Sequence, residues 1–158
     1  MHRPTVAPFL AAAWFALAVL GSPSAARAQG SRDFHADMAA EWETKYTESP
    51  ATGTADFHLD LATLTFTWKI AFKDLTGPLV SAHIYGPAQP GANGQIFIDV
   101  GGKGAKSPLT GSQVLTEAQV QYLLYGWTYV NLITAKWPNG EIRGQLDVVP
   151  PPEFRSPS

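Results

Sequence analysis

Large apolar side chains alternate with polar ones along two stretches of the chain. The apolar positions of the first stretch are Phe34, Ala36, Met38, Ala40 and Trp42. Those of the second stretch are Leu64, Phe66, Trp68, Ile70 and Phe72. Because successive side chains of a β-strand point to opposite faces of a sheet, this period of two predicts two strands that each bury one face. Trp42 is thereby predicted to continue the buried series.

Five further segments are predicted to be strands, over residues 53–61, 79–85, 95–100, 127–134 and 141–149. The strand over 53–61 is expected to meet the strand over 64–72 in a hairpin around residues 60–63. Asn139-Gly140 supplies the positive φ that a type I′ turn needs, and Pro138 ends the preceding strand, which predicts a tight hairpin between the last two strands. The glycine-rich segments 86–94 and 101–111 are expected to be loops.

One segment departs from the β pattern. Thr116 and Gln119 match a capping box, the apolar residues of 120–124 recur at helical spacing, and Gly126 is placed to end a helix. The spacing predicts a helix of roughly two to three turns. Together with about seven short strands, it predicts an all-β domain, a sandwich or barrel with Greek-key connections and one short helix between late strands.

The first 28 residues have the layout of a secretory signal peptide. An apolar run over 7–20 is followed by Gly21, Ser22 and Pro23, and then by an A-x-A cleavage signal at residues 26–28. The alternative is an uncleaved anchor, but a run of about 14 residues is shorter than the roughly 20 that span a bilayer. We therefore expect a secreted or periplasmic protein with a domain over 29–149, a Pro-rich, disordered tail over 150–158 and no later membrane span.

Charge and cysteine content narrow the classes of partner and of chemistry. Removal of residues 1–28 leaves nine Lys and Arg against 13 Asp and Glu, a formal charge of −4. A mildly acidic domain without a Lys/Arg cluster argues against nucleic acid as a partner. The chain has no cysteine, which excludes disulfides, thiolate zinc sites and a cysteine nucleophile. It also lacks a G-x-S-x-G elbow and calcium-loop spacing, so no catalytic residue is expected.

Three segments resemble the CHRD (chordin) family. Residues 82–88, AHIYGPA, resemble its AHIHGPA segment, and residues 115–126 resemble its LT…LLxG helix. Residues 129–131, YVN, followed by 139–146, NGEIRGQL, resemble its YVN(V/I)HT…P.GEIRGQL pattern. The resemblance covers most of the chain after residue 28. It implies an immunoglobulin-like or superoxide-dismutase-like Greek-key sandwich and an extracellular or periplasmic location, as in chordin, and it carries no catalytic activity.

The chain departs from this pattern where the family usually has histidine, at Tyr85 and at Ile133. His83 remains, and it is a candidate ligand for copper or zinc if His35 or His58 approaches it in space. The alternative, which we favour, is a partly buried imidazole that binds a backbone carbonyl or a carboxylate. No cofactor is then expected.

Glu141 and Arg143 share a strand face, and we expect them to form a structural charge pair. In this interpretation Arg143 caps loop carbonyls, and Glu141 or Asp99 neutralises its charge. The alternative is a functional site in which Arg143 binds an anion. If the pair is structural, Arg143→Ala should loosen the domain. Asn131 is expected to tie a loop to the sheet.

These residues favour an exported, non-catalytic binding or structural module, with another envelope or matrix protein as its partner. Two alternatives remain. One is a metal-binding protein that uses His83, and the other is a small-molecule binder with a site near Tyr85, Asn131 and Trp137.

Overall fold

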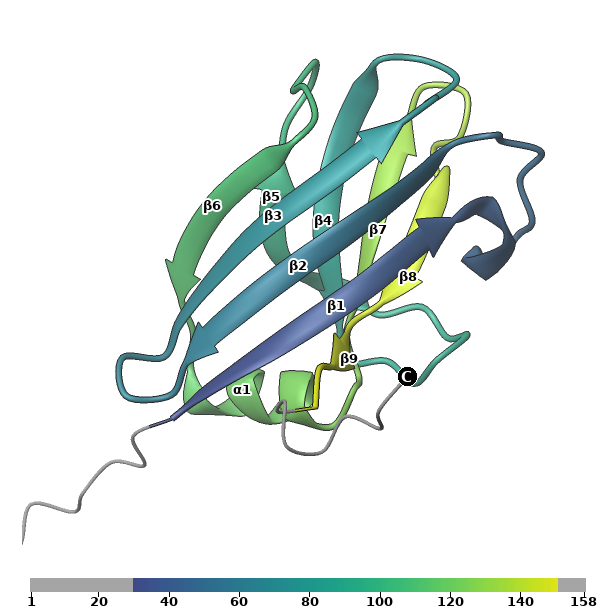
Figure 1. Ribbon diagram of the computed structural model, residues 1–158. Helices are drawn as coiled ribbons and strands as arrows, with labels where there is room; N and C mark the ends of the chain where they lie inside the picture. Colours follow the sequence, from purple (N-terminus) through teal and green to yellow (C-terminus); the bar gives the residue numbers. More distant parts are fainter. Residues whose placement is uncertain (1–29, 151–158) are drawn as a thin grey trace, which may run out of the picture.

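The computed structural model describes residues 30–150 (Figure 1). The expected signal peptide over 1–28 and the tail beyond Pro150 lie outside the described residues. The elements in chain order are β1 (Ser31–Ala39), η1 (Ala40–Trp42), β2 (Thr52–Asp60), β3 (Thr65–Lys73), β4 (Leu79–Gly86), β5 (Gln95–Gly101), β6 (Leu109–Val114), α1 (Glu117–Leu124), β7 (Tyr129–Thr134), β8 (Ile142–Gln145) and β9 (Asp147–Val148).

The strands confirm a mostly β fold with one short helix between late strands. Eight antiparallel strands form a nearly closed, barrel-like sheet in the order β5-β4-β7-β8-β1-β2-β3-β6, and β9 pairs with β1. Figure 1 shows β6, β3, β2 and β1 in front of β5, β4, β7 and β8. We expected a sandwich, whereas the sheet order runs on from β8 to β1 through the pair Ala39–Arg143.

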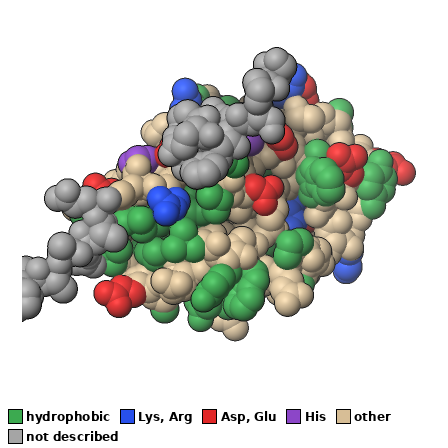
Figure 2. All heavy atoms as spheres, turned by 60° about the horizontal axis from the view of Figure 1, so that its bottom comes forward, with side chains coloured by type: hydrophobic (Ala, Val, Ile, Leu, Met, Phe, Trp, Pro, Cys, Tyr) green, Lys and Arg blue, Asp and Glu red, His purple; other side chains and the backbone are tan. Residues whose placement is uncertain are grey.

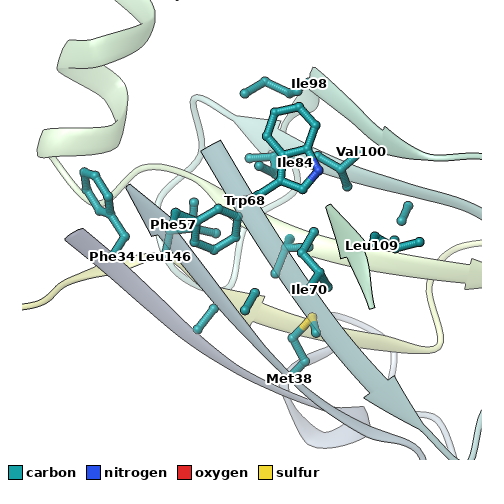
Figure 3. Close-up of a cluster of buried hydrophobic side chains, with 14 of the residues drawn as sticks. Phe34, Met38, Phe57, Trp68, Ile70, Ile84, Ile98, Val100, Leu109 and Leu146 are labelled. Carbon is teal, nitrogen blue, oxygen red and sulfur yellow. The ribbon is translucent and has the colours of Figure 1, made fainter. Parts of the chain in front are cut away.

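The core lies between these two halves and follows from the alternation in the sequence. Figure 3 shows apolar side chains of both halves pointing toward one another. Phe57 on β2 stacks on Phe66 on β3, with ring centroids 5.3 Å apart, and Phe34 on β1 meets Phe66 edge-on. A buried aromatic side chain contributes roughly 1.5–3 kcal/mol through its loss of water contact, so this alternation carries much of the stability of the domain.

Helix α1 confirms the predicted capping box. The Thr116 hydroxyl accepts the backbone N–H of Gln119, and the Gln119 side chain accepts the backbone N–H of Thr116. Gly126 has a φ of 69°, a left-handed conformation that ends the helix without strain. Within residues 30–150, no helix has the length and apolar character needed to cross a membrane.

The predicted hairpin between β2 and β3 is also confirmed. The register pairs Asp60 with Thr65, and the Asp60 carboxylate accepts the backbone N–H groups of Ala62 and Thr63. These two bonds close the turn, because an Asp side chain can replace a missing backbone acceptor two or three residues on.

The turn at Asn139-Gly140 is not of the predicted type. The N–H of Gly140 binds the carbonyl of Trp137, which makes Pro138 and Asn139 the two central residues of the turn. Because proline fixes φ near −65°, the first central position cannot adopt the positive φ of a type I′ turn. The strand that we expected over 141–149 is interrupted between β8 and β9, because Leu146 turns into the core.

Two further expectations were wrong. Strand β6 lies partly within the segment predicted to be a loop, 101–111, because it is an edge strand with one buried residue, Leu109, and therefore lacks an apolar alternation. The chain also leaves β1 at Ala39 and turns through η1, which places Trp42 on the surface, 57% exposed.

Candidate functional site

The outer face of β4, β7 and β8 gathers four of the five residues singled out from the sequence. Backbone register places His83 beside Asn131, and Asn131 beside Arg143. The next row is Tyr85 beside Tyr129. Because the intervening side chains of β4 and β7 enter the core, these residues all point away from it.

Arg143 holds a loop against this face. It is 2% exposed, and its two terminal nitrogens donate to the carbonyl of Ala92 at 2.7 Å and to the side-chain oxygen of Asn93 at 3.2 Å. Its guanidinium carbon lies 3.3 Å from the centre of the Tyr129 ring. The expectation that Arg143 caps loop carbonyls is therefore met, and its charge is used within the fold.

The carboxylate that faces Arg143 is Glu43, which no pattern in the sequence indicated. Burial lowers the pKa of Arg143, and the negative charge of Glu43 opposes this change. Glu141 and Asp99, the two expected partners, make their contacts elsewhere. Glu43 lies just after η1, in a polar segment without periodic pattern, so only the folded chain brings it to β7 and β8.

The surroundings of Glu43 are short of hydrogen-bond donors. The Asn131 side-chain nitrogen lies 3.4 Å from Glu43 Oε2 and 3.4 Å from the carbonyl of Asn139. Glu43 Oε1 and Asn131 Oδ1 are buried without a hydrogen-bond partner. Burial raises the pKa of Glu43 to about 7, although Arg143 and Asn131 oppose this rise. A Cβ atom on Gly140 would lie 2.4 Å from Glu43 Oε1, which explains the glycine there.

Glu141 occupies a different environment. Ser49 Oγ and the N–H of Thr76 donate to its Oε1 at 2.6 and 2.7 Å, and Thr134 Oγ1 donates to Oε2. Burial alone would raise the pKa of Glu141, but these hydrogen bonds outweigh burial and lower it. Glu141 thus ties two loops to the end of β7, and it does not neutralise Arg143.

The three histidines considered as metal ligands do not assemble. His83 Nδ1 lies 3.7 Å from Asp99 Oδ1 and has no hydrogen-bond partner. His35 Nδ1 and His58 Nδ1 bind Asp56 and Asp33 at 2.7 Å on the outer face of β1 and β2. Among residues 30–150, no group of three or more His, Asp or Glu side chains is placed to hold a metal ion. The geometry therefore gives the copper or zinc alternative no support.

The small-molecule site expected near Tyr85, Asn131 and Trp137 is partly filled by other groups of the protein. Asn131 is covered by Glu43 and by the carbonyl of Asn139, and Tyr85 stacks on Tyr129 with ring centroids 5.1 Å apart. Trp137 lies on the loop before β8 and is approached by the Lys136 ammonium at 5.3 Å.

A hollow lies beside Trp42. It has a volume of about 870 Å³ and lies between η1, β8, β9 and the outer face of β1. A second hollow, of about 690 Å³, is also lined by Trp42 and extends along β2 and β3. Asp37, Glu41 and Trp42 line both. We call this exposed indole with its two flanking hollows the Trp42 ridge. On the right of Figure 2, where η1 lies, hydrophobic and acidic side chains stand next to one another.

The protein is a mostly β domain in which the buried charged side chains of Glu141 and Arg143 hold loops against the sheet. The chain is a member of the CHRD domain family, whose sequence model matches residues 34–146. No curated protein and no solved structure matches it.

Proposed function

We propose that this CHRD domain is an exported, non-catalytic binding module, and that its contact surface is the Trp42 ridge. The observation that carries the proposal is the exposed indole of Trp42 between two concave surfaces. The sequence pattern would bury this side chain, and η1 turns it outward instead. A large aromatic side chain that a fold exposes against its own pattern is typical of a recognition site, because Trp residues dominate binding hot spots.

Export belongs to the same proposal. It is supported by the apolar run over 7–20 and by the A-x-A signal at 26–28. The exported protein is expected to begin at Gln29, and N-terminal sequencing of the secreted or periplasmic protein would check this. A protein that retains residues 1–28 would contradict it.

The fold class expected from the sequence, a Greek-key sandwich, is also part of the proposal. The connections from β3 to β4 and from β5 to β6 pass between the two halves of the sheet, as Greek-key connections do. The two halves also share one core.

The test compares three baits. The purified protein, its Trp42→Ala variant and its Tyr125→Ala variant are immobilised and exposed to an envelope extract of the source organism. Tyr125 is a matched control, because it is 63% exposed and lies at the end of α1, away from η1. We expect a partner that the protein and Tyr125→Ala retain and Trp42→Ala loses. If all three baits retain the same proteins, the Trp42 ridge is not the contact surface.

A further inference from the structure

We propose that the Trp42 ridge binds an extended polypeptide segment that presents a Lys or Arg side chain to the indole. This inference rests on the proposed function and names the chemistry of the partner.

The carboxylates around the ridge come from several elements. Asp37 on β1 and Glu41 on η1 line both hollows. Asp147, on β9, adds to the larger hollow, whereas Glu43 faces Arg143 and is largely buried. Acidic groups from separate parts of the chain therefore surround one exposed aromatic ring, and a positively charged group of a partner would gain from each of them.

The cationic residues of the larger hollow cancel only part of this charge, because each is already engaged within the fold. Arg143 is 2% exposed and donates to Ala92 and Asn93, so its charge is directed into the fold. His35 is held between Asp56 and Asp37, at 2.7 and 3.4 Å. On the smaller hollow, Lys73 is the one basic lining residue in the described part of the chain, and it lies at the end of β3.

Trp42 explains why the partner group should be a cationic side chain. A guanidinium or ammonium over an indole face gains about 0.5–1 kcal/mol at an exposed site and more when water is excluded. The carboxylates of Asp37 and Glu41 stand on the same ridge and would bind the remaining N–H donors of that group.

The shape of the surface favours a polypeptide over a small amine. The two hollows, of about 870 and 690 Å³, share Trp42 in their lining, and one reaches β8 and β9 while the other reaches β2 and β3, so an occupant that fills both must pass Trp42. An extended chain can do this, because its successive side chains point to opposite sides. Every second side chain then points to the same side and can enter one of the hollows.

The test uses two synthetic peptides of about eight residues that differ only in two positions, Arg in one and Glu in the other. Each is titrated into the purified protein by calorimetry at about 20 mM and about 200 mM salt. We expect the Arg peptide to bind, to bind more weakly at the higher salt, and to bind at least about tenfold more tightly than the Glu peptide.

Variants then assign the binding to the ridge. Trp42→Ala, and separately the pair Asp37→Asn with Glu41→Gln, should each weaken the Arg peptide by at least about tenfold, whereas Tyr125→Ala should leave it within about twofold. All these side chains are exposed, so unchanged thermal unfolding shows that the variants are folded.

Equal affinity for the two peptides, no binding of the Arg peptide at about 1 mM, or binding that Trp42→Ala leaves unchanged would overturn the inference. The bait comparison tests the proposed function independently of the peptide titration. If the bait comparison finds a partner that depends on Trp42 while the Arg peptide does not bind, the ridge is a contact surface and only its cationic preference is wrong.

Discussion

Glu43 and Glu141 are two largely buried carboxyl groups whose surroundings move their pKa values in opposite directions. Glu141 accepts hydrogen bonds from Ser49, Thr76 and Thr134, and its pKa is lowered. Glu43 has one long contact with Asn131 and an unpartnered Oε1, and its pKa is raised to about 7. The supply of hydrogen-bond donors, more than burial itself, therefore decides whether a buried carboxyl group is ionised.

The two groups therefore contribute to stability over different ranges of pH. The lowered pKa of Glu141 means that its contribution is present above its ordinary value of 4.5 and is lost as the pH falls through the folded value. The raised pKa of Glu43 means that its contribution is present below 4.5 and is lost as the pH rises through about 7.

The largest effect is expected from Glu141→Ala. The variant leaves the donors of Ser49, Thr76 and Thr134 without their acceptor in a buried site, which should lower the free energy of unfolding by about 3–5 kcal/mol. Urea unfolding at neutral pH measures this loss. Glu48→Ala is the matched control, since Glu48 is an exposed residue next to Ser49 and should change stability by less than about 0.5 kcal/mol. A loss below about 1 kcal/mol in Glu141→Ala would show that water replaces the carboxylate.

An intermediate effect of opposite sign is expected from Glu43→Gln. The glutamine is neutral at every pH and its amide can donate to Asn131 Oδ1, which is otherwise unpartnered. After allowance for solvent screening, the variant should be about 1–2 kcal/mol more stable than the protein at about pH 8 and nearly equal to it at about pH 4.5.

Unfolding in urea at several pH values checks this, with Glu48→Gln as the control. If Glu43→Gln is less stable than the protein at about pH 8, the ionised carboxylate stabilises the fold through Arg143, and the contrast with Glu141 is lost.

The smallest effect is expected at an exposed pair. The hydrogen bond that the His35 ring donates to Asp56 is the largest cause of the raised pKa of His35, with Asp37 adding to it and partial burial opposing it. Asp56→Asn should therefore lower the pKa of His35, which NMR titration of the ring measures. The pair stabilises the protein below pH 6.5 and loses this effect as the pH rises through the raised value, by at most about 1 kcal/mol. Asp99→Asn, on β5, should leave His35 unchanged; an equal shift in both variants would point to a long-range charge effect.

Local sequence patterns predicted much of the fold. The capping box at Thr116 and the carboxylate of Asp60 each act within three residues, so the sequence contains both partners of the bond. Strands β2, β3, β4, β5 and β7 lie within two residues of their predicted bounds. Strand β6 was missed because pairing with β3, and not burial of its own side chains, makes it a strand.

The site was predictable only in part. The motif strands indicated Tyr85, Asn131 and Arg143, and strand pairing brings them to one face. Glu43 and Trp42 were not indicated, because their positions depend on where η1 turns after β1. The alternation that predicted a buried Trp42 is a statement about a strand, and it fails where the strand ends.

The pairing of β1 has a mechanical consequence. This strand pairs with β2 along its whole length, but with β8 at Ala39 alone and with β9 at two positions. A load that pulls the two halves of the domain apart is therefore shared by few backbone pairs between β1 and its β8–β9 neighbours. The molecule would yield first along that line, with β1 remaining attached to β2 and the aromatic core opened to water from one side.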